Sequence, residues 1–78
     1  MKTDVNKEEK LKQFANNLKR LRERVSLSQK AVAAAAGITP PQYHKYEHGR
    51  SEPGIVMAAK LATVFGVSVQ ELFAAVDK

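Results

Sequence analysis

The chain has 78 residues, a formal net charge of +5 and no cysteine. A domain of this length buries only about 60 to 65 per cent of its unfolded surface, so we expect modest stability unless it dimerises. The lack of cysteine excludes disulfides and cysteine-based metal sites, and no apolar run approaches the roughly 18 residues that span a bilayer. The polar N-terminus has no apolar signal region, so we expect a soluble intracellular protein without membrane contact.

The excess positive charge is confined to one part of the chain. Residues 19–50 carry seven basic and two acidic side chains, whereas the rest of the chain carries six of each. A basic patch on one segment is typical of proteins that bind a polyanion. The charge distribution therefore predicts a polyanion as the partner.

The first predicted helix follows a short arm. Nothing anchors Met1 to Val5, so we expect a flexible arm there and a single domain over residues 6–78. Asn6 and Glu9 have the spacing of a capping box. Apolar residues then recur every three or four positions, at Leu11, Phe14, Leu18, Leu21 and Val25. This pattern predicts one long amphipathic helix.

Two short helices joined by a glycine turn are predicted between Ser28 and Pro53. Ser28 can cap the first of them, and Gly37 can end it because glycine tolerates the left-handed conformation of a helix C-terminus. Ile38 is expected to pack the turn. The predicted apolar side of this helix consists of Ala31, Val32 and Ala35.

The second short helix has a well-marked start. Thr39 can cap it, Pro40 occupies the first position, where its missing N–H is not needed, and Gln42 can complete a capping box. Gly49 is expected to end the helix. Tyr43 and Tyr46 share one face and are predicted to pack in the core. The outer side carries Gln42, Lys45 and, more laterally, His44 and His48.

Two more helices are predicted after a loop that contains Pro53. The fourth helix ends at Gly66, and its inner face consists of Ile55, Ala58, Leu61, Ala62 and Phe65. Ser68 and Glu71 form a capping box for a fifth helix, whose apolar residues are Leu72, Phe73 and Val76. No strand is predicted, so the expected fold is all-α.

Two short helices, a tight turn and a basic outer face are the parts of a helix-turn-helix. The segment from about Phe14 to Phe73 resembles the Cro/C1-type (XRE) helix-turn-helix family of phage repressors and small bacterial regulators. The most specific shared motifs are Leu27-Ser28-Gln29, Ala33, Gly37-Ile38-Thr39, Glu47-x-Gly49-x-x-x-Pro53, Leu61-Ala62 and Phe65-Gly66-Val67. The resemblance implies a compact five-helix lambda-repressor-like DNA-binding domain. It also implies a sequence-specific, repressor-like transcriptional regulator whose recognition helix, about residues 40–48, enters the major groove of double-stranded DNA.

The resemblance also implies a structural ion pair. In the family an arginine of the first helix meets a carboxylate near the end of the recognition helix, and Arg22 and Glu47 stand at the matching positions. A carboxylate at the negative end of a helix needs such a cation. We therefore expect a largely buried pair with no contact to DNA. Where the family usually has glycine after the first helix, this chain has Ser26.

The implied DNA contacts fall into two groups. Base readout is assigned to Thr39, Pro40, Pro41, Gln42, His44 and Lys45. Phosphate contacts are assigned to Lys19, Arg20, Gln29, Lys30 and Arg50. Pro40 and Pro41 stand where the family usually has polar side chains, and they cannot donate hydrogen bonds, so readout is expected to fall mainly on Lys45. A phosphate contact is the alternative for Lys45, and a solvated surface charge is the alternative for Lys19, Arg20, Lys30 and Arg50.

Apolar residues beyond the needs of a small core indicate self-association. They are Val56, Met57, Val69, Phe73 and Val76. A two-fold homodimer through the last two helices would cover them and set two recognition helices about 34 Å apart, matching half-sites one DNA turn apart. The alternative is that these residues complete the core of a monomer.

Other functions have weaker support. His44 and His48 are spaced to share a metal, but without cysteine or a third histidine we expect no metal, cofactor or small-molecule ligand. No nucleophile with a neighbouring base, paired acids or phosphate loop indicates an enzyme. The main alternative is an antitoxin or accessory protein of the same fold whose chief partner is another protein, and RNA binding is weaker still. The expected location is the cytoplasm of a bacterial host or of a phage-infected cell, on the nucleoid when DNA is bound.

Overall fold

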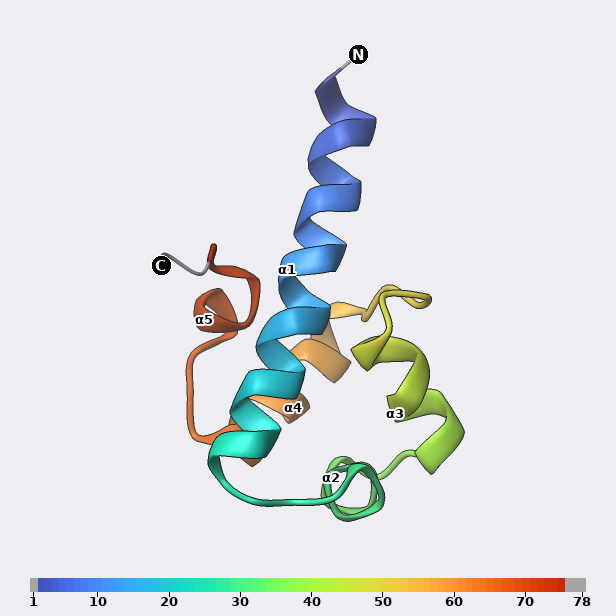
Figure 1. The fold of residues 1–78 in the computed structure, drawn as a ribbon, viewed down its shortest axis with the longest axis vertical. Coiled ribbons are helices and arrows are strands. Elements are labelled where there is room, and N and C mark those ends of the chain that lie inside the picture. The colour runs from blue at the N-terminus through green and yellow to red at the C-terminus, as the bar shows by residue number, and fades with distance from the viewer. Residues whose placement is uncertain (1, 76–78) are drawn as a thin grey trace.

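The structure is a computed structural model that describes the backbone of residues 2–75 and the side chains of residues 7–75. Its helices are α1 (Lys2–Arg24), α2 (Gln29–Ala36), α3 (Pro40–Glu47), α4 (Ile55–Phe65) and α5 (Val69–Phe73), and no strand occurs in residues 2–75. The predicted five-helix, all-α fold is therefore confirmed. α1 is a long rod whose N-terminal turns project beyond the body that the other helices form around its C-terminal half (Figure 1).

The start of α1 differs from the prediction. The helix begins at Lys2, so residues 2–5 are helical, and Asn6 lies inside the helix and is not its cap. The physical reason is local, because residues 2–10 contain no proline or glycine and several lysine and glutamate residues, which are good helix formers. A capping-box spacing within such a run does not by itself start a helix.

The C-terminal half of α1 forms the centre of the core. Phe14, Leu18 and Leu21 are at most 3% exposed and pack between α3 and α5. Val25, which was predicted to continue this stripe, is 42% exposed because α1 ends at Arg24. Ser26 then adopts a φ of +59°, the left-handed conformation for which glycine is usual.

The ends of α2 agree with the prediction. Ser28 Oγ accepts a hydrogen bond from the Ala31 N–H at 3.0 Å, and Gly37 follows the helix with a φ of +75°. Ile38 packs against the core. The predicted inner face was rotated, since the buried residues are Val32, Ala33 and Ala36, whereas Ala35 is exposed. An almost unbroken run of alanine has too little hydrophobic contrast to show which side faces inward.

α3 begins and ends close to the predicted positions. Thr39 Oγ1 accepts from the Gln42 N–H at 3.3 Å, which forms one half of the predicted capping box, and Gly49 follows the helix with a φ of +70°. The hydrogen bonds of the described residues do not include the return bond from the Gln42 side chain. Tyr43 and Tyr46 are 0% and 5% exposed and belong to the core, as predicted.

α4 and α5 close the core on the other side. The buried residues of α4 are Ala58, Leu61, Ala62 and Phe65. Ile55, which was predicted on this face, is 89% exposed because it lies in the first turn of α4, where no other element covers it. The predicted capping box of Ser68 and Glu71 is present in both directions. Leu72 is buried, Phe73 stacks on Phe14 with a centroid distance of 5.0 Å, and Val76 lies outside the described residues.

Asn17 of α1 forms hydrogen bonds with the C-terminal end of α5. Its side chain is fully buried, and its Nδ2 donates to the carbonyl oxygens of Leu72 and Ala74, both at 2.9 Å. Its Oδ1 accepts from Arg20 Nη2 at 3.0 Å. The sequence analysis missed this residue, although an asparagine within an apolar stripe is itself a signal of a buried polar contact.

Candidate nucleic-acid interface

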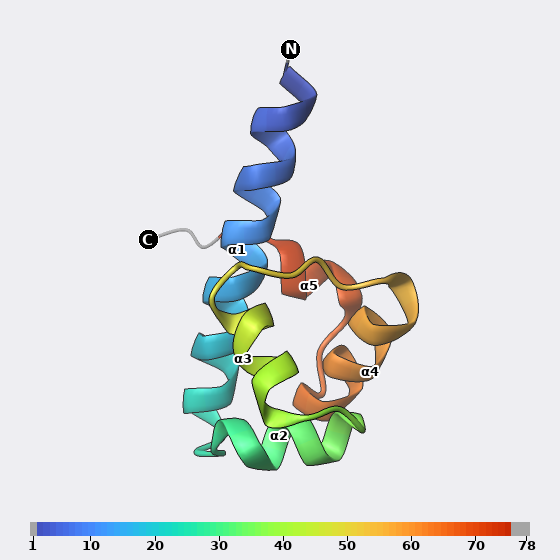
Figure 2. The ribbon, with the colours of Figure 1, turned by 90° about the vertical axis from the view of Figure 1, so that its right-hand side faces the viewer.

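α2 and the tight turn after it lie at the end of the molecule opposite the projecting part of α1, and α3 runs from that end along the side of the molecule (Figure 2). α3 packs on α1 and α2 through Tyr43, Tyr46 and Glu47, which are buried. Its opposite side is exposed and carries every residue that the sequence analysis assigned to base readout, namely Thr39, Pro40, Pro41, Gln42, His44 and Lys45. The six residues are therefore all exposed, at the N-cap and around the solvent side of α3, and we call this surface the α3 outer face.

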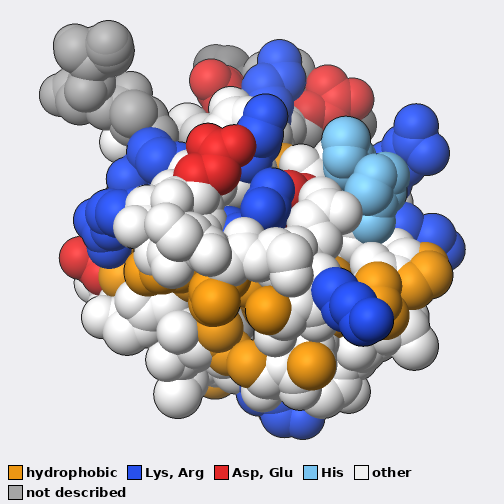
Figure 3. Space-filling view, turned by 60° about the horizontal axis from the view of Figure 1, so that its bottom comes forward, with side chains coloured by type: hydrophobic (Ala, Val, Ile, Leu, Met, Phe, Trp, Pro, Cys, Tyr) orange, Lys and Arg blue, Asp and Glu red, His pale blue; other side chains and the backbone are white. Residues whose placement is uncertain are grey.

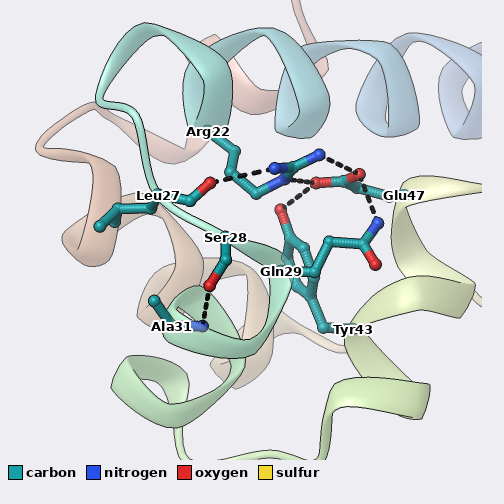
Figure 4. A network of polar contacts seen from close by, with 7 residues as sticks. All are labelled: Arg22, Leu27, Ser28, Gln29, Ala31, Tyr43 and Glu47. Carbon is teal, nitrogen blue, oxygen red and sulfur yellow. Dashed lines mark hydrogen bonds and ion pairs between the residues drawn. The ribbon is translucent and has the colours of Figure 1, made fainter.

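A buried network fixes the end of α3 (Figure 4). Arg22 Nη2 donates to Glu47 Oε1 at 3.2 Å, and Arg22 Nε donates to Oε2 of the same carboxylate. Gln29 Nε2 donates to Glu47 Oε1 at 2.9 Å, and Tyr43 Oη donates to Oε2 at 2.7 Å. Arg22 Nη1 also donates to the Leu27 carbonyl at 3.0 Å. One carboxylate thus ties α3 to α1 and α2.

Ionisation within this network follows from its contacts. Burial raises the pKa of the Glu47 carboxyl, but hydrogen bonds from Arg22, Gln29 and Tyr43 outweigh burial and bring that pKa below its ordinary value. Burial and the hydrogen bond to the carboxylate raise the pKa of the Tyr43 phenol far above its ordinary value. At neutral pH, Glu47 is therefore an anion and Tyr43 is a neutral donor.

Gln29 has two groups that can donate to a phosphate, its backbone N–H and its side-chain carboxamide. It is the first residue of α2, where backbone N–H groups point out of the helix and the dipole favours an anion. Its side chain, however, is half-buried and donates to Glu47. The backbone N–H groups of Gln29 and Lys30 are therefore the donors best placed to meet a phosphate, since the Ala31 N–H already donates to Ser28. The Gln29 carboxamide joins them only if it leaves Glu47.

The basic residues do not all share this end of the molecule. Lys30 is the second residue of α2, and Arg50 follows α3 with its N–H bonded to the Lys45 carbonyl at 2.9 Å. Both are exposed, as is Lys19 on α1. Figure 3, which brings the α2 end forward, shows Lys and Arg side chains around this face and the two histidines together at one side.

Arg20 lies apart from this group. Its guanidinium donates to Asn17. It also lines a hollow of about 160 Å³ between α1 and the α5 region, together with Leu21, Arg24, Val67, Glu71 and Ala74. The structure therefore does not bring Arg20 to the α3 outer face.

Metal binding and membrane insertion each need a recognisable arrangement of residues. Among the described residues, no group of three or more His, Cys, Asp or Glu side chains is arranged to hold a metal ion. None of the described helices combines the length and the apolar character that a membrane span requires.

Comparison with known proteins places this geometry in a family. A model of the helix-turn-helix family matches residues 18–72. Over 59 residues the chain is 39% identical to a SPbeta prophage-derived uncharacterized HTH-type transcriptional regulator, YonR, of Bacillus subtilis, covering 76% of this chain and 55% of the relative. Over 64 residues it is 31% identical to the HTH-type transcriptional regulator DdrOP3 of Deinococcus deserti, covering 82% of this chain and 50% of the relative. The chain thus spans about half the length of the curated relatives that it matches.

Solved structures agree with this result. The restriction-modification controller protein C.AhdI from Aeromonas hydrophila superposes with a TM-score of 0.77 at 32% identity, over 81% of this chain and 96% of that one. The iron(II) protein HppE, solved in complex with substrate, superposes with a TM-score of 0.76 at 31% identity, but over only 37% of its own chain. From the matched family model, the identities and the two-helix geometry, the chain belongs to the XRE-type (Cro/C1-type) helix-turn-helix family.

Proposed function

We propose that this protein is a sequence-specific double-stranded DNA-binding transcriptional regulator that acts in the cytoplasm by occupying promoter DNA. The observation that carries the proposal is the α3 outer face, exposed along its length and held from behind by the Glu47 network. Relatives named as transcriptional regulators and a restriction-modification controller of the same fold support it. The proposal concerns the helix-turn-helix part that this chain shares with them, and it includes no catalytic role.

Base readout is proposed to centre on Lys45. Pro40 and Pro41 are exposed at the first two positions of α3, where they can offer apolar contact to a thymine methyl but no hydrogen bond. Lys45 lies on the same exposed side, further along α3, with a side chain long enough to reach guanine O6 and N7. Thr39, Gln42 and His44 assist, and DNA shape contributes where the prolines make no polar contact.

Phosphate contact is proposed for residues at the edges of the helix pair. Lys30 and the first-turn N–H groups at Gln29 would meet one strand, and Arg50, after α3, the other side of the groove. Lys19 adds charge from α1. Arg20 is left out of the proposed contact set because it is bonded to Asn17 and lies in the hollow toward α5.

Dimerisation through α4 and α5 is also proposed. Ile55 and Val56 are 89% and 67% exposed at the start of α4, and Val69 is 42% exposed at the start of α5. Adjacent exposed aliphatic side chains are characteristic of an interaction surface. Met57 and Phe73, which were also assigned to the interface, are half-buried and pack against the core, so they contribute less. A two-fold dimer would present two α3 outer faces to successive major-groove segments.

Selection from a pool of random duplexes tests the proposal directly. Bound duplexes are enriched and sequenced, and fluorescence anisotropy then compares the selected duplex with its single strands and with an RNA duplex of the same sequence. We expect an enriched motif and tighter binding to the DNA duplex, by about 10³-fold or more over unrelated DNA. Enrichment of no motif, or equal binding to the RNA duplex, would contradict the proposal.

Capture of partners from cell lysate with and without nuclease separates this function from that of an antitoxin or accessory protein. A regulator whose main ligand is DNA loses its co-purifying material when nuclease is added. A protein that remains in equal amount after nuclease treatment would favour the accessory function.

A further inference from the structure

The two histidines of the chain form a pair on α3. His44 and His48 are both exposed, and their ring centroids are 4.0 Å apart with a tilt of 30° between the ring planes. They are one helical turn apart, so their side chains project from the same face of the helix. The C-terminal end of α3 thus holds two imidazoles side by side.

The spacing of the pair, and not its present ring orientation, suits a chelate. Imidazole nitrogens bind zinc at about 2.0 to 2.1 Å, which places two nitrogens of a tetrahedral site about 3.3 Å apart. The two rings now face each other with a tilt of 30°, so both side chains must rotate to aim one nitrogen each at the same ion, and two histidines four positions apart on a helix have the spacing to do so. Little ordering of the backbone is needed, because His44 lies in α3 and His48 is its C-cap residue, whose N–H donates to the His44 carbonyl oxygen at 3.1 Å.

We propose that His44 and His48 form an open two-histidine site for a first-row transition-metal dication, with water filling the remaining coordination positions. Imidazole suits copper, nickel and zinc, whereas magnesium and calcium require oxygen ligands that this pair does not supply. The sequence analysis argued against a metal because a closed structural zinc site needs more ligands. An open site needs only the two histidines, because water occupies the other coordination positions.

The charges around the two histidines determine how tightly the pair should bind a metal ion. His48 also borders a hollow whose charged lining residues are Glu8, Lys12 and Glu47. Glu8 and Lys12 carry opposite charges, the charge of Glu47 is offset by Arg22, and Lys45 lies between the two histidines in the sequence. The site thus has no net anionic environment to raise its affinity. The affinity should follow the usual order for divalent first-row metals, so copper(II) should bind more tightly than nickel(II) or zinc(II).

Isothermal titration of the untagged protein with CuCl₂, NiCl₂ and ZnCl₂ in a weakly coordinating buffer tests the site. The chain is well suited to this, since it has two histidines and no cysteine. We expect one metal ion per chain for copper and no binding of MgCl₂. His44→Gln and His48→Gln should each weaken copper binding by at least about tenfold, since losing even a supporting residue of a metal site costs that much. Lys60→Ala, which removes an exposed positive charge from α4, is the control and should keep the wild-type affinity within about twofold.

Proton NMR identifies the ligands independently of affinity. Under the proposal, zinc shifts the ring C–H resonances of both histidines at the same metal concentration, because both bind one ion. No binding at millimolar metal, copper affinity unchanged in either single variant, or a shift of one ring alone would overturn the proposal. The titrations contain no DNA, so failure of the proposed DNA function would leave these outcomes unchanged.

Discussion

The carboxylate of Glu47, at the end of α3, is paired with the guanidinium of Arg22 on α1, and the two side chains are only 2% and 16% exposed. The pair joins the proposed recognition helix to the long helix that forms the centre of the core. It also places a cation beside a carboxylate that the α3 dipole would otherwise disfavour. The orientation of the α3 outer face therefore depends on an ion pair that lies behind it.

Arg22→Met is expected to destabilise the protein by about 3 kcal/mol, because it leaves the buried Glu47 carboxylate without its cation. Urea denaturation followed by circular dichroism measures the loss. Arg24→Met removes the same charge from an exposed position in the same helix turn and should change stability by less than about 0.5 kcal/mol. If Arg22→Met left stability unchanged but abolished DNA binding, Arg22 would be a DNA contact and its structural role would be wrong.

Stability should fall in acid partly because of Glu47. Its pKa is lower in the folded protein than in the unfolded chain, so the ionised carboxylate stabilises the fold above the unfolded pKa of about 4.3. This stabilisation is lost as the pH falls from there through the folded pKa. The free energy of unfolding, measured from pH 7 to pH 3, should therefore drop more steeply in the wild type than in Glu47→Gln.

Glu52→Gln provides the control for that experiment. Glu52 pairs with Lys7 at 3.3 Å, but the two side chains are 58% and 62% exposed, and such pairs contribute little. The free energy of unfolding of Glu52→Gln should therefore depend on pH as it does in the wild type. A Glu47→Gln profile as steep as the wild type would show that other carboxylates cause the acid sensitivity.

Asn17→Ala is expected to cost about 2 kcal/mol. The change leaves the carbonyls of Leu72 and Ala74 without their side-chain donor, and the first of these bonds is buried. Hydrogen exchange should show earlier opening of α5 than of α3. Asn16→Ala is the natural control, because Asn16 is exposed on the same helix. Equal stability of the two variants would mean that Asn17 does not hold α5 in place.

Val56→Lys should separate the proposed dimer. Val56 is 67% exposed beside Ile55, so a lysine there leaves the monomer fold intact but places two like charges near the two-fold axis. Sedimentation equilibrium should show a dimer for the wild type and a monomer for the variant at the same high micromolar concentration. Asn16→Lys, which adds the same charge on α1, should remain dimeric. A wild-type protein that is monomeric under these conditions would contradict the dimer.

Local chemistry made the helix-turn-helix predictable from the sequence. Ser28, Thr39 and Ser68 accept hydrogen bonds from the first turns of their helices, and Gly37 takes the left-handed conformation, as the sequence pattern predicted. Caps and turns depend on residues within three or four positions of each other, so a sequence alone can reveal them.

The features that could not be predicted from the sequence depend on tertiary packing. The inward side of α2, the exposure of Ile55 and the burial of Asn17 depend on which other helix lies opposite, and no local pattern records that. In the candidate site, the contact of Gln29 with Glu47 and the distance of Arg20 from α3 depend on how α1 packs against α3 and α5. Helical periodicity placed Arg20 outside the core but not on a particular side of the molecule.

Lys45→Ala tests the central claim, that the α3 outer face reads DNA sequence. Binding is measured by anisotropy on the selected duplex and on every single-base variant of it, at two salt concentrations. If Lys45 contacts a base, the variant should lose about 1 to 3 kcal/mol on the selected duplex and show relaxed preference at one base position per half-site. Lys30→Ala, in the proposed phosphate group, should instead weaken all duplexes alike and lower the salt slope by about one. A uniform loss for Lys45→Ala across all duplexes, with the preference at every position intact, would contradict the account.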